Sequence, residues 1–382
     1  MPSQVFALAL AGILALAACA NALRGGAASP STEGSRSPSI RTAPDPERLW
    51  GWLPPGWSEL EAPPVVRARA VSVWTGRELV YWGGDTHFAG QHHADGASFD
   101  PIAGTWHEVA PSPLAGRSSA GAVWTGTEVI VWGGWADEPF SDGAAYTPET
   151  NTWRTLPEGP LSGRDPVAVV WTGGEVIVWG NASRAEADTS GAAYDPASDR
   201  WRTIAQAPLA LNEASAVWTG REMLIYGALL DHNNSSDTRY ARGLAYEPAA
   251  DSWRLLPDFP LSPQASTAVW SGQHLLVWDY EFNAGTYDPV TDRWRELPGP
   301  PFRFYECYPA STALPNATFA WSCGQAALFD VGSELWQEVG VPRQPMFGGP
   351  VAADGVVLFA GAAHESVHNA LWVYKPDEPA SG

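Results

Sequence analysis

The chain has 382 residues and a formal net charge of −20, from 42 acidic residues against 22 Lys and Arg. Nucleic acids and anionic lipid surfaces are bound mainly through Lys and Arg, so this balance argues against both as partners. The 21 Trp, 38 Gly and 34 Pro, with 17% charged residues, are typical of an all-β protein rich in turns and aromatic residues.

The N-terminus reads as an export signal. Residues 5–18 are apolar without interruption, too short to span a bilayer comfortably, and end in small residues. The next residue is Cys19, in a Leu-Ala-Ala-Cys context that resembles the bacterial lipobox, although the four residues before the apolar run lack Lys and Arg. The resemblance implies a signal peptide over 1–18 and lipidation of Cys19. The alternative is an ordinary secretory signal with an incidental Cys.

The segment after Cys19 is predicted to be a tether. Residues 24–48 are rich in Pro, Ser and Gly and have almost no large apolar side chains, so they cannot bury enough surface to fold. We therefore expect residues 19–48 to hold an exported domain off a membrane, in the periplasm or at the cell surface, with the lipid as the only membrane contact.

A repeated unit follows. A segment that runs from Trp through Thr-Gly to an apolar run ending in Trp occurs at 74–84, 124–134 and 171–180, with weaker copies from Trp218 and Trp270. A second element ends in Trp at 106, 153, 201, 253, 294 and 336, in steps of 47, 48, 52, 41 and 42 residues. Steps of this size are typical of four-stranded propeller blades.

Turn chemistry assigns four strands, a to d, to each unit. Thr-Gly and Asp-Pro between apolar runs close tight turns. In the second unit, strand a ends at Trp124, strand b covers 129–132, strand c covers 144–146 and strand d starts near Trp153. The b strands are apolar on both faces, which predicts that each is sandwiched between neighbouring blades.

Fifteen of the 21 Trp recur at equivalent positions of these units. Packing between blades is the expected role, and sugar-stacking platforms are the alternative. These residues are Trp74, Trp82, Trp106, Trp124, Trp132, Trp153, Trp171, Trp179, Trp201, Trp218, Trp253, Trp270, Trp278, Trp294 and Trp336.

The pattern resembles the kelch repeat. That family is marked by a Gly-Gly doublet after strand b and by a downstream Tyr and Trp. Gly133-Gly134 with Tyr146 and Trp153 carries these marks, and the preceding unit does so with Phe99 in place of Tyr. The resemblance extends to the central domain of galactose oxidase and to bacterial surface lipoproteins, and it implies an all-β, kelch-type β-propeller.

The two ends of the repeat region complement each other. Six units end in Trp, whereas 351–361 and 369–374 supply strands a to c without a strand d. Residues 57–64 match the missing strand, so pairing it into the last blade would close the ring and remove sheet edges. We predict seven blades over 49–376, with six or eight as alternatives, and a C-terminal tail over 377–382.

Strand order places the a–b and c–d turns on one face, called here the short-turn face, and the b–c and d–a loops on the other, the long-loop face. Five long, variable segments fall on the long-loop face, so a site is expected there or at the mouth of the central channel. They are residues 85–96, 135–143, 181–191, 228–242 and 361–369.

Histidines gather on the predicted long-loop face of blades one and seven, which adjoin once the ring closes. They are His87, His92, His93, His364 and His368, accompanied by Asp85, Asp95 and Glu365. Neutral imidazole suits Zn or Cu, so a metal site is one interpretation. The alternative is a set of solvated surface histidines, because the spacing matches no known ligand motif. No other cofactor is expected.

Three arginines stand seven residues before the strand-a Trp of consecutive units: Arg67, Arg117 and Arg164. At the channel rim such a cluster could bind a carboxylate, for example of a uronic or sialic acid or an acidic peptide. The alternative is that each arginine ties one blade's loop to the next through a carbonyl or carboxylate.

Besides Cys19, the chain has Cys307 and Cys323. They align with the outer ends of neighbouring antiparallel strands a and b, which predicts a disulfide in an oxidising compartment, with free thiols as the alternative.

These features favour a binding module, expected to be monomeric, that recognises a protein or glycan through its long-loop face. The alternative is a carbohydrate-active enzyme, either an isomerase resembling sialate mutarotase or a metal-dependent sugar oxidase. No nucleophile elbow, phosphate-binding Gly loop or zinc-protease motif is found in the sequence, which favours binding over catalysis.

Overall fold

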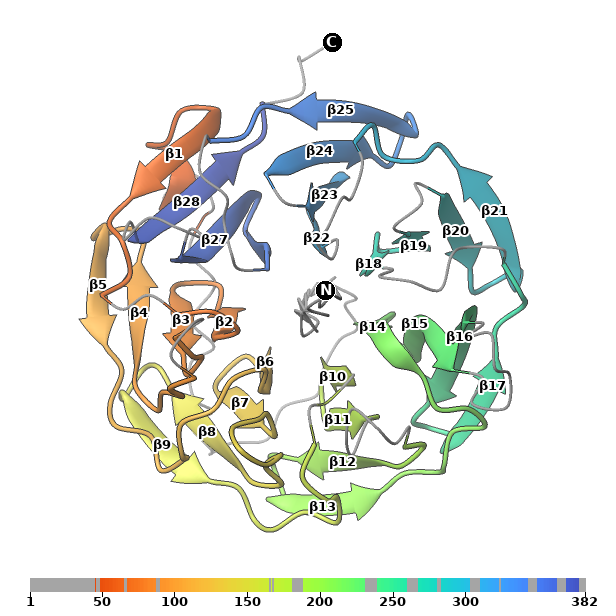
Figure 1. Ribbon diagram of the computed structural model, residues 1–382, viewed down its shortest axis with the longest axis horizontal. Coiled ribbons are helices and arrows are strands. Elements are labelled where there is room, and N and C mark those ends of the chain that lie inside the picture. The colour runs from red at the N-terminus through yellow and green to blue at the C-terminus, as the bar shows by residue number, and fades with distance from the viewer. Residues whose placement is uncertain are drawn as a thin grey trace, which may run out of the picture.

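The fold is a ring of four-stranded antiparallel sheets, seen in a computed structural model (Figure 1). The structure describes residues 45, 49–64, 67–86, 90–164, 166, 168–180, 188–230, 239–259, 267–279, 283–302, 310–322, 324–342, 349–362 and 369–377. No helix among these residues is both long and apolar enough to cross a membrane.

Seven blades make up the ring, each with its strands in the order a-b-c-d from the axis outward. Blade 1 consists of β2 (Val71–Trp74), β3 (Leu79–Trp82), β4 (Gly96–Asp100) and β5 (Thr105–Glu108). Blade 2 consists of β6 (Gly121–Trp124), β7 (Val129–Trp132), β8 (Gly143–Thr147) and β9 (Thr152–Thr155). Blade 3 consists of β10 (Ala168–Trp171), β11 (Val176–Trp179), β12 (Gly191–Asp195) and β13 (Arg200–Thr203). Blade 4 consists of β14 (Asn212–Trp218), β15 (Met223–Leu230), β16 (Arg239–Glu247) and β17 (Ser252–Leu255).

The remaining blades complete the ring. Blade 5 consists of β18 (Thr267–Trp270), β19 (Leu275–Trp278), β20 (Ala284–Asp288) and β21 (Arg293–Leu297). Blade 6 consists of β22 (Ala310–Ala313), β23 (Ala317–Ser322), β24 (Gln325–Asp330) and β25 (Leu335–Val339). Blade 7 consists of β26 (Val351–Ala353), β27 (Val356–Ala362), β28 (Asn369–Lys375) and, from the other end of the chain, β1 (Gly56–Leu60).

The predicted ring closure is confirmed. Strand β1 pairs antiparallel with β28, with Gly56 opposite Lys375 and Leu60 opposite Leu371. The Trp57 ring packs against the Phe359 and Tyr374 rings of the same blade, at 5.7 and 5.1 Å between centroids. Its indole N–H donates to the Gly340 carbonyl of blade 6.

The turns form for the reasons that the sequence suggests. Between β6 and β7 the Thr125 hydroxyl accepts from the Glu128 N–H at 3.0 Å, and Gly126 adopts φ 99°. Between β12 and β13 the Asp195 carboxylate accepts from the Ala197 N–H at 2.8 Å, and Asp199 takes φ 54°. Both turns use residues that tolerate positive φ or bond their own backbone.

One expected loop is shorter than predicted. The sequence assigned 228–242 to a long loop, but β15 and β16 continue pairing as far as Leu230 opposite Arg239. The hairpin extends because its register runs on through Gly227 opposite Arg242 without interruption.

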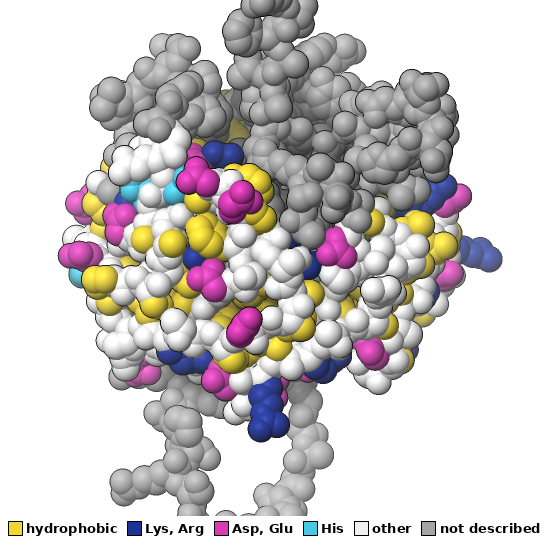
Figure 2. Space-filling model, turned by 60° about the horizontal axis from the view of Figure 1, so that its bottom comes forward, with side chains coloured by type: hydrophobic (Ala, Val, Ile, Leu, Met, Phe, Trp, Pro, Cys, Tyr) yellow, Lys and Arg dark blue, Asp and Glu magenta, His cyan; other side chains and the backbone are white. Residues whose placement is uncertain are grey.

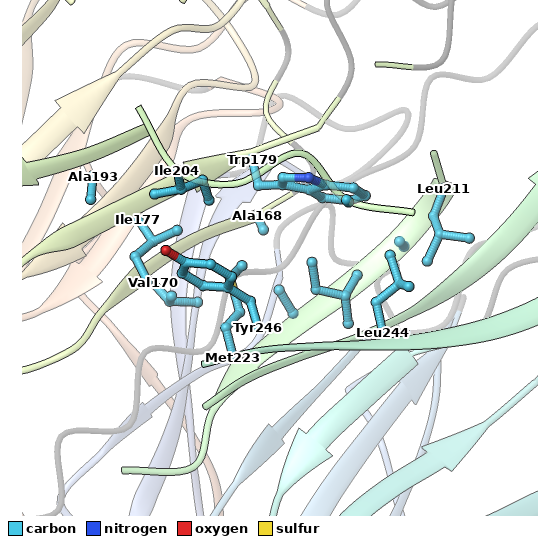
Figure 3. Close-up of a cluster of buried hydrophobic side chains, with 14 residues drawn as sticks. Ala168, Val170, Ile177, Trp179, Ala193, Ile204, Leu211, Met223, Leu244 and Tyr246 are labelled. Atoms are coloured by element: carbon cyan, nitrogen blue, oxygen red, sulfur yellow. The ribbon is translucent and has the colours of Figure 1, made fainter. Parts of the chain in front are cut away.

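The core lies between blades rather than within them. Each apolar cluster joins the b and c strands of one blade to those of the next. Figure 3 shows Val170 and Ile177 of blade 3 facing Met223 and Tyr246 of blade 4. Because every blade is covered on both sides, its b strand is buried throughout, as in β7 and β11.

The chain enters the ring on the short-turn face. A helical turn at residues 49 and 50 packs the Trp50 ring 5.7 Å from the Trp74 ring, at the end of β2. The Lys375 ammonium donates to the Trp50 and Leu53 carbonyls at 3.2 and 3.3 Å. Residue 375 ends β28, so the lead-in and the end of the last strand meet on this face.

Candidate functional site

The structure describes only part of the predicted site. Arg67, Arg117, Arg164, His92 and His93 are described. Residues that lie outside the described part of the chain are Cys19, His87, Cys307, Cys323, His364, Glu365 and His368. The lipidation, the disulfide and most of the metal-ligand set therefore stay predictions.

The three arginines are buried where the inner strands begin. The exposed fractions of Arg67, Arg117 and Arg164 are 3%, 1% and 1%. Each guanidinium donates to the carbonyl at the end of its own strand b, at Gly83, Gly133 or Gly180, over 3.2 to 3.4 Å. Each guanidinium therefore ties the start of an inner strand to the b–c loop of the same blade. The backbone joins neighbouring blades, because the N–H groups of Arg117 and Arg164 donate to the His93 and Phe140 carbonyls in the b–c loop of the preceding blade.

Carboxylates in the b–c loops complete these contacts. Arg117 binds both oxygens of Asp142, at 2.7 and 3.2 Å. Arg67 pairs with Asp95, and Arg164 with Asp188. Burial alone would raise the pKa of Asp95, but the hydrogen bond and charge of Arg67 outweigh it and lower that pKa below its ordinary value. A ligand role for the three arginines stays a prediction.

Blade 1 adds a second ion pair beside the first. Arg69 has φ 54° and its guanidinium pairs with Asp85, which is 1% exposed. Backbone bridges join Asp85 to Ala68 on one side and to His92 on the other. We call the set Arg67, Arg69, Asp85, Thr86, His92, His93 and Asp95 the blade-1 corner.

The blade-1 corner concentrates buried polar atoms that have no partner. Among the described residues, eleven buried side-chain nitrogen or oxygen atoms lack a hydrogen bond, and six of them are in this corner. They are Arg67 Nε, Arg69 Nε, Asp85 Oδ1, Thr86 Oγ1, His92 Nδ1 and His93 Nε2. Buried polar groups are normally paired, because an unmade hydrogen bond costs about 1–3 kcal/mol. Such a concentration makes the blade-1 corner the candidate functional site among the described residues.

Blade 2 has the same backbone and keeps one ion pair, Arg117–Asp142, but it has uncharged side chains at the positions of Arg69, Asp85, His92 and His93. Ser118 and Pro139 bridge to Trp135 as Ala68 and His92 bridge to Asp85. Ser119 adopts φ 55° where Arg69 adopts 54°. The Arg69–Asp85 pair and the two histidines of blade 1 are therefore not needed to form this corner.

The position of His93 shows the same contrast. In blade 2 it is occupied by Phe140, whose ring lies 3.9 Å from the Arg117 guanidinium carbon. Both residues donate their N–H to the second Gly of the doublet, Gly84 or Gly134, at 2.9 Å.

The corner is electrically balanced. The charges of Arg67 and Arg69 offset those of Asp95 and Asp85. Burial, followed by the charge of Arg67, lowers the pKa of His93 below its ordinary value, so its imidazole is neutral at pH 7. The corner thus offers neutral donors and acceptors beside two paired charges. Figure 2 shows histidine side chains next to acidic side chains near one edge of the disc.

No metal site is formed by the described residues alone: they contain no group of three His, Cys, Asp or Glu placed to hold an ion. His92 and His93 lie close together, and His93 Nδ1 is 3.9 Å from Asp95 Oδ1. A Zn or Cu site would need residues outside the described part of the chain, and it stays a prediction.

Sequence reasoning missed Arg69 and Thr86. A comparison of equivalent positions could have found them, because the second residue after the buried arginine is Arg69 in blade 1, Ser119 in blade 2 and Pro166 in blade 3. Thr86 likewise stands where blade 2 has Ala136. Both blade-1 residues are more polar than a repeat of this type requires.

Comparison with known proteins agrees with this architecture. Residues 116–160, which contain all of blade 2, match the family model of the Kelch motif. No curated protein sequence matches the chain. The match falls on the blade that carries the Gly-Gly doublet with Tyr146 and Trp153, and the same four-stranded unit occurs seven times around the ring. The chain is therefore a β-propeller with seven four-stranded blades, and its second blade matches the kelch motif.

Proposed function

We propose that this protein is an extracytoplasmic, lipid-anchored binding module that recognises a protein or glycan partner through its long-loop face. A kelch β-propeller is consistent with a protein-binding scaffold. Because one fold hosts many functions, the proposal depends on the site rather than on the fold.

The blade-1 corner is the observation that carries this proposal. Its six unpartnered polar atoms are buried, although the matching corner of blade 2 has none. Buried polar atoms without partners lower the stability of the fold. Proteins commonly tolerate such a loss of stability at functional sites. Arg69 and His93 have side chains exposed by 27% and 21%, so the corner also reaches the surface.

The entry point of the chain supports the orientation of the module. The lead-in at Leu49 and Leu53 lies on the short-turn face, against Lys375. The tether predicted over residues 19–48 would then hold the short-turn face toward the membrane. The long-loop face would point away from the membrane, toward a partner.

The test compares two ion pairs on opposite faces. Arg69→Ser/Asp85→Asn removes the corner pair, and Arg295→Ser/Glu334→Ser removes an exposed pair on the short-turn face as a matched control. Each protein is applied to a glycan array and cross-linked to envelope proteins of the source cells. We expect the first variant to lose captured partners about tenfold and the control to retain them.

Two outcomes would contradict the proposal. Equal capture by both variants would show that the partner does not contact the corner. Stoichiometric Cu or Zn in protein purified without a His tag would favour the enzymatic alternative.

The lipid anchor is tested separately with Cys19→Ala. We expect this variant to be released into the soluble fraction, and its retention at the membrane would refute the anchor.

A further inference from the structure

The repeated tryptophans do not all have the same surroundings. In every blade the strand-d indole donates its N–H to a carbonyl in the segment that leaves the preceding blade. Strand-d residues with this bond are Trp57, Trp106, Trp153, Trp201, Trp253, Trp294 and Trp336. These indoles tie each blade to its neighbour, as the sequence predicts.

The tryptophans that end strand b are also structural. Trp82, Trp132, Trp179 and Trp278 are each at most 1% exposed and lie in the clusters between blades. They are closed to any ligand.

The tryptophans that end strand a are more exposed than those that end strand b. The last residue of strand a is a partly exposed Trp in five consecutive blades. We call Trp74, Trp124, Trp171, Trp218 and Trp270 the tryptophan arc. Each packs against a cluster between blades and is partly exposed.

Most indole N–H groups of the arc are free. Trp74 donates to the Asp354 carboxylate at 2.9 Å. Within the described residues, the other four have no hydrogen-bond acceptor, and none of their nitrogens is among the buried atoms without a partner. These four N–H groups therefore face solvent. A Trp that only packed would bury this group or pair it, as the strand-d set does.

The arc surrounds the channel mouth on the short-turn face. Strands β2, β6, β10, β14 and β18 are innermost in their blades (Figure 1), and their last residues lie next to the a–b turns. Blades 6 and 7 have Ala313 and Ala353 at this position, so the arc has a gap there. At the blade-1 end, Trp52 of the lead-in adds a side chain that is 54% exposed.

Several charges next to the arc are paired, whereas Arg77 in the a–b turn of blade 1 is exposed and has no ion pair among the described residues. The glutamates that begin or precede β7, β11 and β15 bind arginines of the same blades, in the pairs Glu128–Arg154, Glu175–Arg202 and Glu222–Arg254. These arginines also reach a Tyr hydroxyl or an Asp of the next blade. The pairing leaves these cations engaged, and the net charge of −20 repels anions.

We propose that the tryptophan arc binds a neutral glycan chain. A pyranose ring presents a flat C–H face that packs on an indole, and ring or hydroxyl oxygens beside it that accept from the indole N–H. The arc would offer a chain of sugar rings five indoles at equivalent positions of consecutive blades. This site lies on the face opposite the blade-1 corner and does not depend on the function proposed for that corner.

The test is titration of the full chain with neutral hexasaccharides of glucose, mannose, galactose and N-acetylglucosamine, followed by calorimetry and Trp fluorescence. We expect at least one to bind, Trp171→Ala to weaken it about tenfold, and Trp124→Ala/Trp171→Ala to abolish it. Trp171→Phe keeps a ring but loses the N–H, so it should weaken binding less. Arg69→Ser/Asp85→Asn, on the other face, should leave it unchanged.

Thermal melting separates loss of binding from loss of fold. If Trp171→Ala melts much earlier than the parent chain, Trp171→Phe becomes the deciding variant. The proposal is overturned if no neutral hexasaccharide binds, or if the arc variants bind as the parent does. Equal binding of an acidic oligogalacturonate, or displacement of the sugar by a peptide of residues 24–44, would assign the arc to another occupant.

Discussion

The corners of blades 1 and 2 share one backbone and differ in chemistry. In both, a buried arginine binds the first Gly of a doublet and an Asp of the b–c loop. Around that frame blade 2 places Ser119, Trp135 and Phe140, whereas blade 1 places Arg69, Asp85 and His93. The repeat thus fixes a scaffold, and one copy of it carries extra polar groups.

The buried arginines of the two blades also differ in their hydrogen bonds. Arg117 uses its Nε to bind the Ala115 carbonyl at 3.0 Å and stacks on Phe140. Arg67 has an unpartnered Nε. The same residue type is therefore fully satisfied in the blade that has the neutral corner and incompletely satisfied in the blade that has the charged one.

The largest expected effect comes from removing these arginines. Arg117→Ala should lower the free energy of unfolding by about 3 kcal/mol, because it strands buried carbonyls and opens a gap beside Phe140. Arg67→Ala should cost less, about 2 kcal/mol, since fewer bonds are lost. Urea denaturation measures both, and Arg117→Met tests how much is packing. Equal losses would show that a partner satisfies Arg67 Nε as well.

A second contrast is expected between single and double changes of the corner ion pair. Arg69→Ser alone should destabilise the fold by about 3 kcal/mol, because Asp85 would keep a buried charge without its partner. Arg69→Ser/Asp85→Asn removes both charges and should stay within about 1 kcal/mol of the parent chain. Denaturation of the two variants in parallel is the measurement. If the double variant is as unstable as the single one, the Arg69–Asp85 pair is required for the stability of the fold.

The smallest effect is the pH dependence of His93. Burial and Arg67 hold its pKa below the ordinary value, so the folded chain binds a proton here less readily than the unfolded chain. The stability contribution is complete above the ordinary histidine pKa of about 6.5 and is lost as the pH falls through the lowered one. His93→Phe introduces the residue that blade 2 has at this position. Its melting temperature should therefore fall less between pH 7 and pH 5 than that of the parent chain. An unchanged loss would exclude His93 as a source of the acid sensitivity.

Much of the fold could be predicted because its causes are local. Thr-Gly and Asp-Pro turns, alternation within strands and the spacing of Trp each act over a few residues, and they place strands such as β6 and β7 within a residue or two. Ring closure was also predictable, because Trp57 and the residues after it repeat a pattern that the last unit lacks. The extended β15–β16 hairpin was missed because long-range pairing, not turn chemistry, decides its length.

The candidate site was predictable in position but not in detail. The arginine spacing indicated that Arg67, Arg117 and Arg164 occupy equivalent places just before the inner strands, and their role in binding a ligand stays a prediction. A sequence does not show which acceptors fold back over a side chain. Arg69 escaped notice because its importance depends on Asp85, which comes 16 residues later and is brought beside it by a backbone bridge.

By itself the sequence determined the four-stranded unit, the strand order and the two faces, since these follow from a repeated local pattern and from chain connectivity. It favoured seven blades over six or eight, and the structure fixed the count at seven. Only the tertiary structure decided which repeated residues are structural and which are available. Trp153 and Trp124 look alike in sequence, yet the neighbouring blade supplies an acceptor for the first indole and none for the second. The physical reason is that burial and hydrogen bonding are properties of neighbours in space, and each blade acquires those neighbours only when the ring closes.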